Sequence, residues 1–83
     1  MEEKQIATIT HFYGNIGVAV LKLSGPLKIG DSIHVKGASA DFIQQVSSME
    51  VDHKAIASAS TGDEIGMKLD QKTKAGDKVF LAN

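Results

Sequence analysis

The sequence predicts a small all-β protein, and three observations lead to this class. Short runs of β-branched and apolar residues recur along the chain, Gly-Asp turns separate several of them, and only 83 residues are available. Chains of this length usually form one domain, so residues 1–83 are expected to make a single unit. Hydrophobic residues make up 42% of the sequence and aromatic residues only 5%, which predicts an aliphatic core.

Three turns share the pattern Gly-Asp-x-(Ile or Val), at Gly30–Ile33, Gly62–Ile65 and Gly76–Val79. Glycine adopts a positive φ without steric cost, and an aspartate side chain can accept hydrogen bonds from nearby backbone amides. A β-branched residue then favours entry into a strand. We therefore expect positive φ at or near all three glycines and a strand directly after each turn.

Six strands are expected along the chain from the β-type residue pattern. They are Gln5–Tyr13, Val18–Leu23, Ser32–Lys36, Phe42–Val51, Glu64–Leu69 and Lys78–Leu81. Strict alternation in the first would separate Ile6, Thr8, Thr10 and Phe12 on one face from Ala7, Ile9, His11 and Tyr13 on the other. In the third strand, the inward residues are expected to be Ile33 and Val35.

The fourth expected strand does not keep a period of two, because its apolar positions fall at Ile43, Val46, Met49 and Val51. A bulge or a helical turn would explain this spacing, and the Val-Ser-Ser sequence that begins at Val46 favours the bulge. Residues 56–59 are ambiguous. Short strands separated by glycine turns predict a small, closed or nearly closed antiparallel barrel, which leaves few exposed strand edges.

Charge and composition exclude several classes of protein. The chain has no cysteine, and its nine basic residues are all lysines against ten acidic ones, for a net charge of −1. Without arginine or an excess of positive charge, the usual features of a DNA-binding protein are missing. The start of the sequence is polar, and the longest apolar run, Ile16–Leu21, is too short for a membrane helix. The sequence predicts a cytoplasmic protein that binds neither DNA nor membrane.

Motifs for catalysis and cofactors are weak. Gly25–Ser32 has the glycine spacing of a phosphate-binding loop, but Asp31 replaces the lysine that would contact phosphate, so no nucleotide is expected. The histidines His11, His34 and His53 lack the spacing of zinc ligands. There is no Gly-x-Ser-x-Gly nucleophile motif. We expect no enzymatic activity, no catalytic residue, no metal and no cofactor.

Four polar residues form the candidate binding site. Glu50 and Asp52 are two apart and would face the same way on a strand, His53 follows directly, and Glu64 opens the next clear strand. The alternative interpretation is a solvated acidic edge with no function. Three neighbouring carboxylates would raise the proton affinity of His53, so binding at this site would depend on mild acidity.

Four stretches of the chain resemble the second domain of translational GTPases, the family of elongation factor Tu. They are Ile16–Val20, Leu27–Gly37, Ser48–Lys54 and Gly62–Gly66. The resemblance implies a six-stranded antiparallel Greek-key barrel of the elongation factor Tu domain 2 type, here as a stand-alone protein. A more distant similarity is to the accessory barrel at the end of collagenase-like peptidases.

The resemblance also implies a function. The family segment that binds the aminoacyl end of tRNA aligns with Glu50–Glu64, but Asp52, His53 and Glu64 replace an aromatic residue, an arginine and an asparagine. These changes remove base stacking and a phosphate partner. The expected function is a non-catalytic binding module for a protein or ribonucleoprotein partner in translation. The alternatives are direct binding of RNA or an aminoacyl-tRNA end, and an accessory subunit of a separately encoded enzyme such as a peptidase.

Overall fold

The computed structural model describes residues 4–38, 40–52 and 54–82, and all regular structure in them is β. No helix in these ranges is long and apolar enough to cross a membrane. The ten strands are β1 (Lys4–Tyr13), β2 (Val18–Leu23), β3 (Leu27–Lys28), β4 (Ser32–Lys36), β5 (Asp41–Gln45), β6 (Met49–Val51), β7 (Lys54–Ile56), β8 (Ser58–Ala59), β9 (Glu64–Lys68) and β10 (Lys78–Leu81).

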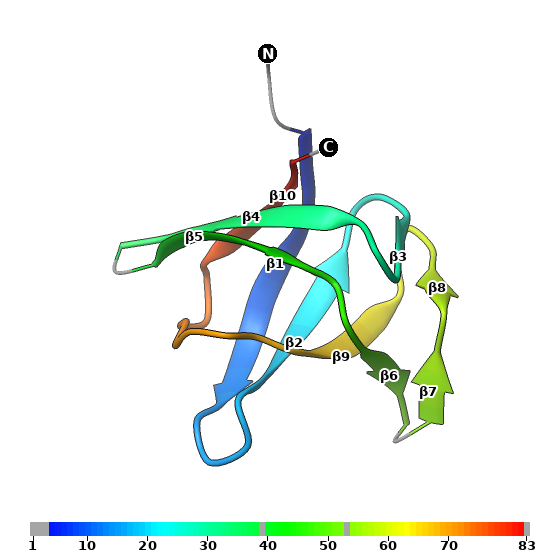
Figure 1. Ribbon diagram of the computed structural model, residues 1–83, viewed down its shortest axis with the longest axis horizontal. Helices are drawn as coiled ribbons and strands as arrows, with labels where there is room; N and C mark the ends of the chain where they lie inside the picture. The colour runs from blue at the N-terminus through cyan, green and yellow to red at the C-terminus, as the bar shows by residue number, and fades with distance from the viewer. Residues whose placement is uncertain (1–3, 39, 53, 83) are drawn as a thin grey trace.

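Eight strands form one antiparallel sheet in the order β5-β4-β10-β1-β2-β9-β6-β7, and β3 pairs with β8 in a separate two-stranded ribbon. The chain neighbours β5 and β6 lie far apart in this order. The chain therefore passes from one end of the sheet to near the other through residues 46–48, and the sheet curls (Figure 1). The first and last strands, β1 and β10, are paired with each other.

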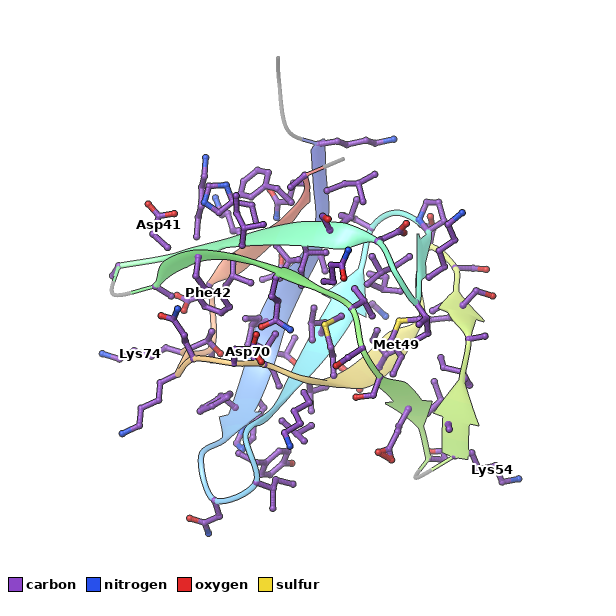
Figure 2. All side chains as sticks on the ribbon, viewed as in Figure 1. Asp41, Phe42, Met49, Lys54, Asp70 and Lys74 are labelled. Carbon is purple, nitrogen blue, oxygen red and sulfur yellow. The ribbon has the colours of Figure 1, made fainter. Side chains whose placement is uncertain are left out.

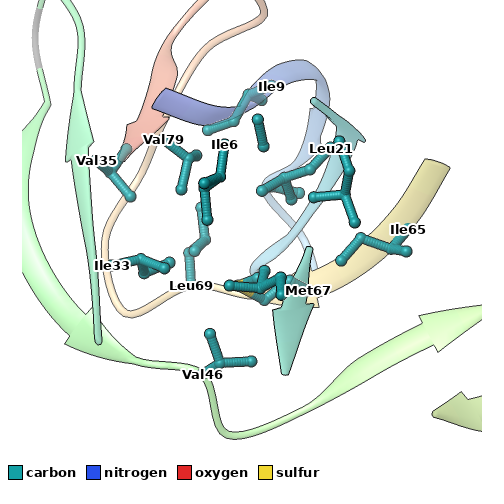
Figure 3. Close-up of a cluster of buried hydrophobic side chains, with 14 of the residues drawn as sticks. Ile6, Ile9, Leu21, Ile33, Val35, Val46, Ile65, Met67, Leu69 and Val79 are labelled. Carbon is teal, nitrogen blue, oxygen red and sulfur yellow. The ribbon is translucent and has the colours of Figure 1, made fainter. Parts of the chain in front are cut away.

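The curled sheet encloses an aliphatic core, as the composition predicted. Its largest fully buried side chains are Ile6, Ile9, Leu21, Leu27, Ile33, Met49, Ile65, Met67, Val35, Val46 and Val79. They converge from most strands of the sheet (Figure 3). Burial of each side chain of this type contributes about 1.5–3 kcal/mol, so this cluster is the main source of stability.

The strict alternation expected in the first strand is wrong, because β1 contains two irregularities. Its register shifts against β10 between Gln5 and Ala7, and against β2 between Ile9 and His11. Ile6, Ala7 and Ile9 are consequently all buried. A bulge adds one residue to one strand of a pair, which moves the following side chains to the other face.

The fourth expected strand, a single bulged strand over Phe42–Val51, is wrong, because residues 46–48 divide it into β5 and β6. Val46 is buried in the interruption, whereas Ile43 is 63% exposed. With β6 separate and with β7 paired beside it, the main sheet has eight strands. The all-β antiparallel class is confirmed, but the expected six-stranded barrel of the elongation factor Tu type is not.

The three Gly-Asp turns have the expected geometry. Gly30, Gly62 and Gly76 have φ values of 94°, 93° and 96°. In each turn the aspartate N–H donates to the carbonyl oxygen three residues earlier, and its carboxylate accepts from the N–H of that same residue. Strands β4, β9 and β10 begin at the residue after each aspartate.

Each turn also binds one buried residue of another segment through two backbone hydrogen bonds. The glycine N–H donates to that residue's carbonyl oxygen, and the aspartate carbonyl accepts from its N–H, at distances of 2.7–2.9 Å. The three residues bound in this way are Val46, Leu23 and Ile9. Val46 lies in the β5–β6 interruption and Ile9 at an irregularity of β1, so the turns stabilise the points where strands bend.

Candidate functional site

The structure brings three of the four predicted site residues to one groove of about 350 Å³. The groove is lined by Tyr13, Ile16, Val18, Val20, Glu50, Val51, Asp52, Glu64, Ile65 and Gly66. His53 lies outside the described residues, so the dependence of binding on mild acidity that was expected from it stays a prediction. The groove is therefore described from Glu50, Asp52 and Glu64 and from the apolar residues beside them.

The floor of the groove is the outer face of the sheet where β2, β9 and β6 lie side by side. Gly66 pairs with Val20 on one side and with Glu50 on the other. The neighbours of Gly66 along β9, Ile65 and Met67, are buried in the core, so position 66 faces outward. A Cβ atom at Gly66 would lie 3.6 Å from Val18 Cγ1, so the missing side chain leaves space above the floor.

One wall is formed by Tyr13, the last residue of β1, and by Ile16 in the turn that follows. Their exposed fractions are 49% and 62%, which is high for large hydrophobic side chains. The Tyr13 carbonyl accepts hydrogen bonds from the N–H groups of Ile16 (3.2 Å) and Gly17 (2.9 Å), and Leu69 N–H donates to Gly17 O (2.9 Å). The Tyr13 ring packs on His11 with centroids 4.3 Å apart. These contacts hold the wall in place.

The opposite wall is the β6–β7 hairpin, in which Val51 pairs with Lys54 across a two-residue connection (Figure 1). Asp52, the first residue of that connection, has a φ of 52°. This left-handed conformation is uncommon outside glycine, but aspartate adopts it more readily than most residues and it suits tight hairpins. The turn thereby places Asp52 at the rim of the groove.

The rim is acidic, and no side chain in the described part of the chain forms an ion pair with it. Glu50, Asp52 and Glu64 are exposed, and none of them makes an ion pair or a side-chain hydrogen bond with another described residue. Lys22 lies opposite Glu64 in the β2–β9 register, but its Nζ donates to the Gly62 carbonyl at 3.1 Å. Hydrogen-bond acceptors therefore border an apolar floor, an arrangement that suits N–H and ammonium groups.

Sequence reasoning missed the apolar half of the groove, namely Tyr13, Ile16, Val18, Val20 and Gly66. Two signals were present. A strand with one face in water usually alternates apolar and polar residues, yet valines 18 and 20 both occupy the outer face of β2. A glycine inside a strand, such as Gly66, often marks a close approach of another chain or ligand.

Another polar contact joins His34 on β4 to Asp41 on β5, with 2.5 Å between Nε2 and Oδ1. The hydrogen bond from His34 lowers the pKa of the Asp41 carboxyl below its ordinary value. A lowered folded-state pKa means that the contact stabilises the fold above the unfolded pKa of about 4, and that this contribution is lost as pH falls through the folded pKa.

We therefore expect the carboxyl carbon of Asp41 to titrate at a lower pH in the native protein than in the His34→Leu variant. A carbon-13 chemical-shift titration measures both midpoints. Equal midpoints in the two proteins would show that the ring does not bind the carboxylate in solution.

No family model matches the chain. Over 78 residues, or 93% of the chain, it is 35% identical to an uncharacterized protease of Methanocaldococcus jannaschii. The chain spans only 19% of that protein's length.

Two solved structures share the fold, and both are of the C-terminal domain of a putative U32 peptidase from Geobacillus thermoleovorans. The selenomethionine variant has a TM-score of 0.88, with 93% of this chain and 98% of that one covered. The other has a TM-score of 0.90, with 96% and 93% covered. Sequence identity is 12% in both, so these matches show the fold.

The resemblance to elongation factor Tu, and with it the translation-related function, is therefore wrong. The relative that matches over 78 residues is named as an uncharacterized protease, and the structural neighbours are domains of a putative peptidase. The reason lies in the stretches that carried the resemblance. They contain Gly-Asp turns and strand starts, which specify backbone geometry, and one fold can serve unrelated functions. The more distant similarity to a peptidase accessory barrel was the better guide.

Proposed function

We propose that this chain is a non-catalytic accessory domain of a U32-type peptidase, and that it supplies a polypeptide-binding surface to a catalytic part. The observation that carries this proposal is the fold match, which covers 98% and 93% of the solved C-terminal domain rather than a fragment of it. The 35% identity to a protease over almost the whole chain supports the same family.

The composition of the groove supports a role in binding rather than catalysis. Its lining contains three carboxylates, one tyrosine and apolar residues, but no serine, threonine or cysteine that could act as a nucleophile. In the described part of the chain, no three His, Asp or Glu side chains are placed to hold a metal ion. The acidic rim also opposes phosphate groups, which disfavours RNA as the partner.

Docking in trans tests this proposal. The Methanocaldococcus jannaschii protease is prepared with and without the 78-residue segment that matches this chain. Calorimetry then measures the affinity of the shortened protease for this chain, with the isolated segment as the positive control. We expect both to bind the shortened protein, and neither to bind the full-length protease, in which the position is occupied.

Two results would contradict the proposal. One is that the control segment binds the shortened protease and this chain does not. The other is that this chain, alone and pure, cleaves unfolded casein at a rate that rises with its concentration, because an accessory domain has no activity of its own.

A further inference from the structure

We infer that the acidic groove binds a short, extended and basic segment of a polypeptide substrate, with an aliphatic side chain on the valine floor and lysine or arginine at the rim. This inference rests on the proposed function, since it names what the accessory domain would present to the catalytic part. Three features of the groove carry it: its apolar surface, its charge and its size.

The apolar surface is continuous across the floor and one wall. Val18 and Val20 are only partly buried on the outer face of β2, and Tyr13 and Ile16 stand beside them with about half or more of their surface exposed. Single exposed hydrophobic residues are ordinary, but neighbouring ones that line a concave surface mark an interaction site. An aliphatic side chain would remove this surface from water.

Charge selects a basic segment. Glu50, Asp52 and Glu64 edge the groove, and no described cation forms an ion pair with them. A lysine or arginine beside the aliphatic residue would form ion pairs with this rim, whereas a glutamate would be repelled. Such complementarity determines the choice of partner and the rate of association more than the total affinity.

Size favours a substrate segment over a permanent interface. A volume of about 350 Å³ is near the lower limit for ligand pockets, which hold ~300–1,000 Å³. A stable protein–protein interface buries ~800 Å² on each partner, far more surface than this groove offers. Short segments bind such a groove weakly and exchange quickly, as a substrate passing to a catalytic site must.

The test is a titration of nitrogen-15-labelled protein with a blocked heptapeptide of alternating lysine and leucine. We expect chemical-shift changes at Tyr13, Ile16, Glu50 and Gly66 and a Kd of about 0.1–1 mM. A peptide with glutamate in place of lysine should not bind. A peptide with glycine in place of leucine should bind at least about fivefold more weakly, because each buried aliphatic side chain contributes strongly.

Matched variants distinguish peptide binding at the groove from nonspecific electrostatic attraction to the protein. The double variant E50Q/E64Q removes two rim charges and should weaken binding about tenfold. Asp41→Asn makes the same kind of charge change at the end of the molecule opposite Lys54 and the β6–β7 hairpin, and should leave the Kd unchanged (Figure 2). Gly66→Ala adds one methyl group above the floor, at ordinary contact distance from Val18, and should weaken binding without unfolding the protein.

Other outcomes overturn the inference. Equal affinity for the lysine and glutamate peptides, an unchanged Kd in E50Q/E64Q, or shift changes confined to other surfaces would each do so. If E50Q/E64Q instead abolishes docking to the shortened protease, the groove binds the catalytic part, and the proposed function survives without a substrate segment there. If the peptide binds as described but docking fails, the groove chemistry stands and the accessory role fails.

Discussion

Removal of the Asp77 carboxylate in an Asp77→Ala variant is expected to lower the free energy of unfolding by about 2 kcal/mol. Asp77 is only 6% exposed, and its carboxylate accepts a hydrogen bond from Lys74 N–H at 2.9 Å. Without it, a partly buried amide donor has no partner. The turn would also hold Ile9 less firmly, because Gly76 and Asp77 are hydrogen-bonded to Ile9 through their backbones.

Asp63→Ala is the matched control, because the equivalent turn makes the same bond to Ser60 N–H at 2.9 Å in an exposed setting. Water can replace the lost acceptor there, so the expected cost is about 0.5–1 kcal/mol. Urea unfolding followed by circular dichroism measures both values. Equal losses in the two variants would show that burial does not govern the strength of these turns.

Gln44→Leu is expected to cost about 2–3 kcal/mol, because the buried amide of Gln44 satisfies two backbone groups at once. Its Oε1 accepts from Asp70 N–H at 2.8 Å and its Nε2 donates to Lys68 O at 3.2 Å. The side chain thus links β5, at one end of the sheet order, to the last residue of β9 and to the segment that follows it. Leucine fills a similar volume but leaves both groups unpaired.

The adjacent Gln45→Leu is the control for that experiment, since residue 45 lies on the same strand and is exposed. A surface change of this kind is expected to stay within about 0.5 kcal/mol. Thermal or urea unfolding compares the two variants. A Gln44 variant as stable as the Gln45 variant would mean that water enters and satisfies Lys68 and Asp70.

The features predicted from sequence are those that depend on neighbours along the chain. Positive φ at Gly30 and the start of β4 follow from the local Gly-Asp pattern, because glycine conformation and aspartate hydrogen bonding act within four residues. The irregularities of β1 do not follow from its own residues. They depend on partners distant in the sequence, since the turn at Gly76–Asp77 binds Ile9 across most of the chain.

The same distinction applies to the candidate site: its charged residues could be predicted from the sequence, and its apolar floor could not. Carboxylates at Glu50, Asp52 and Glu64 are visible as charges beside strand ends, and the structure places all three at one groove. The apolar floor was hidden because outward-facing valines look like core residues until the sheet order is known. Whether His53 takes part stays a prediction.

The pairing of β1 with β10 has a practical consequence for measuring how a peptide binds to the groove. Lys4 lies opposite Leu81, so both ends of the described chain leave the sheet together, and Tyr13 at the far end of β1 borders the groove (Figure 1). A strand of ten residues spans about 30 Å. A fluorophore or surface anchor attached near either terminus would therefore leave the groove open. Energy transfer from such a dye to a labelled peptide would report occupancy over a distance well suited to that method.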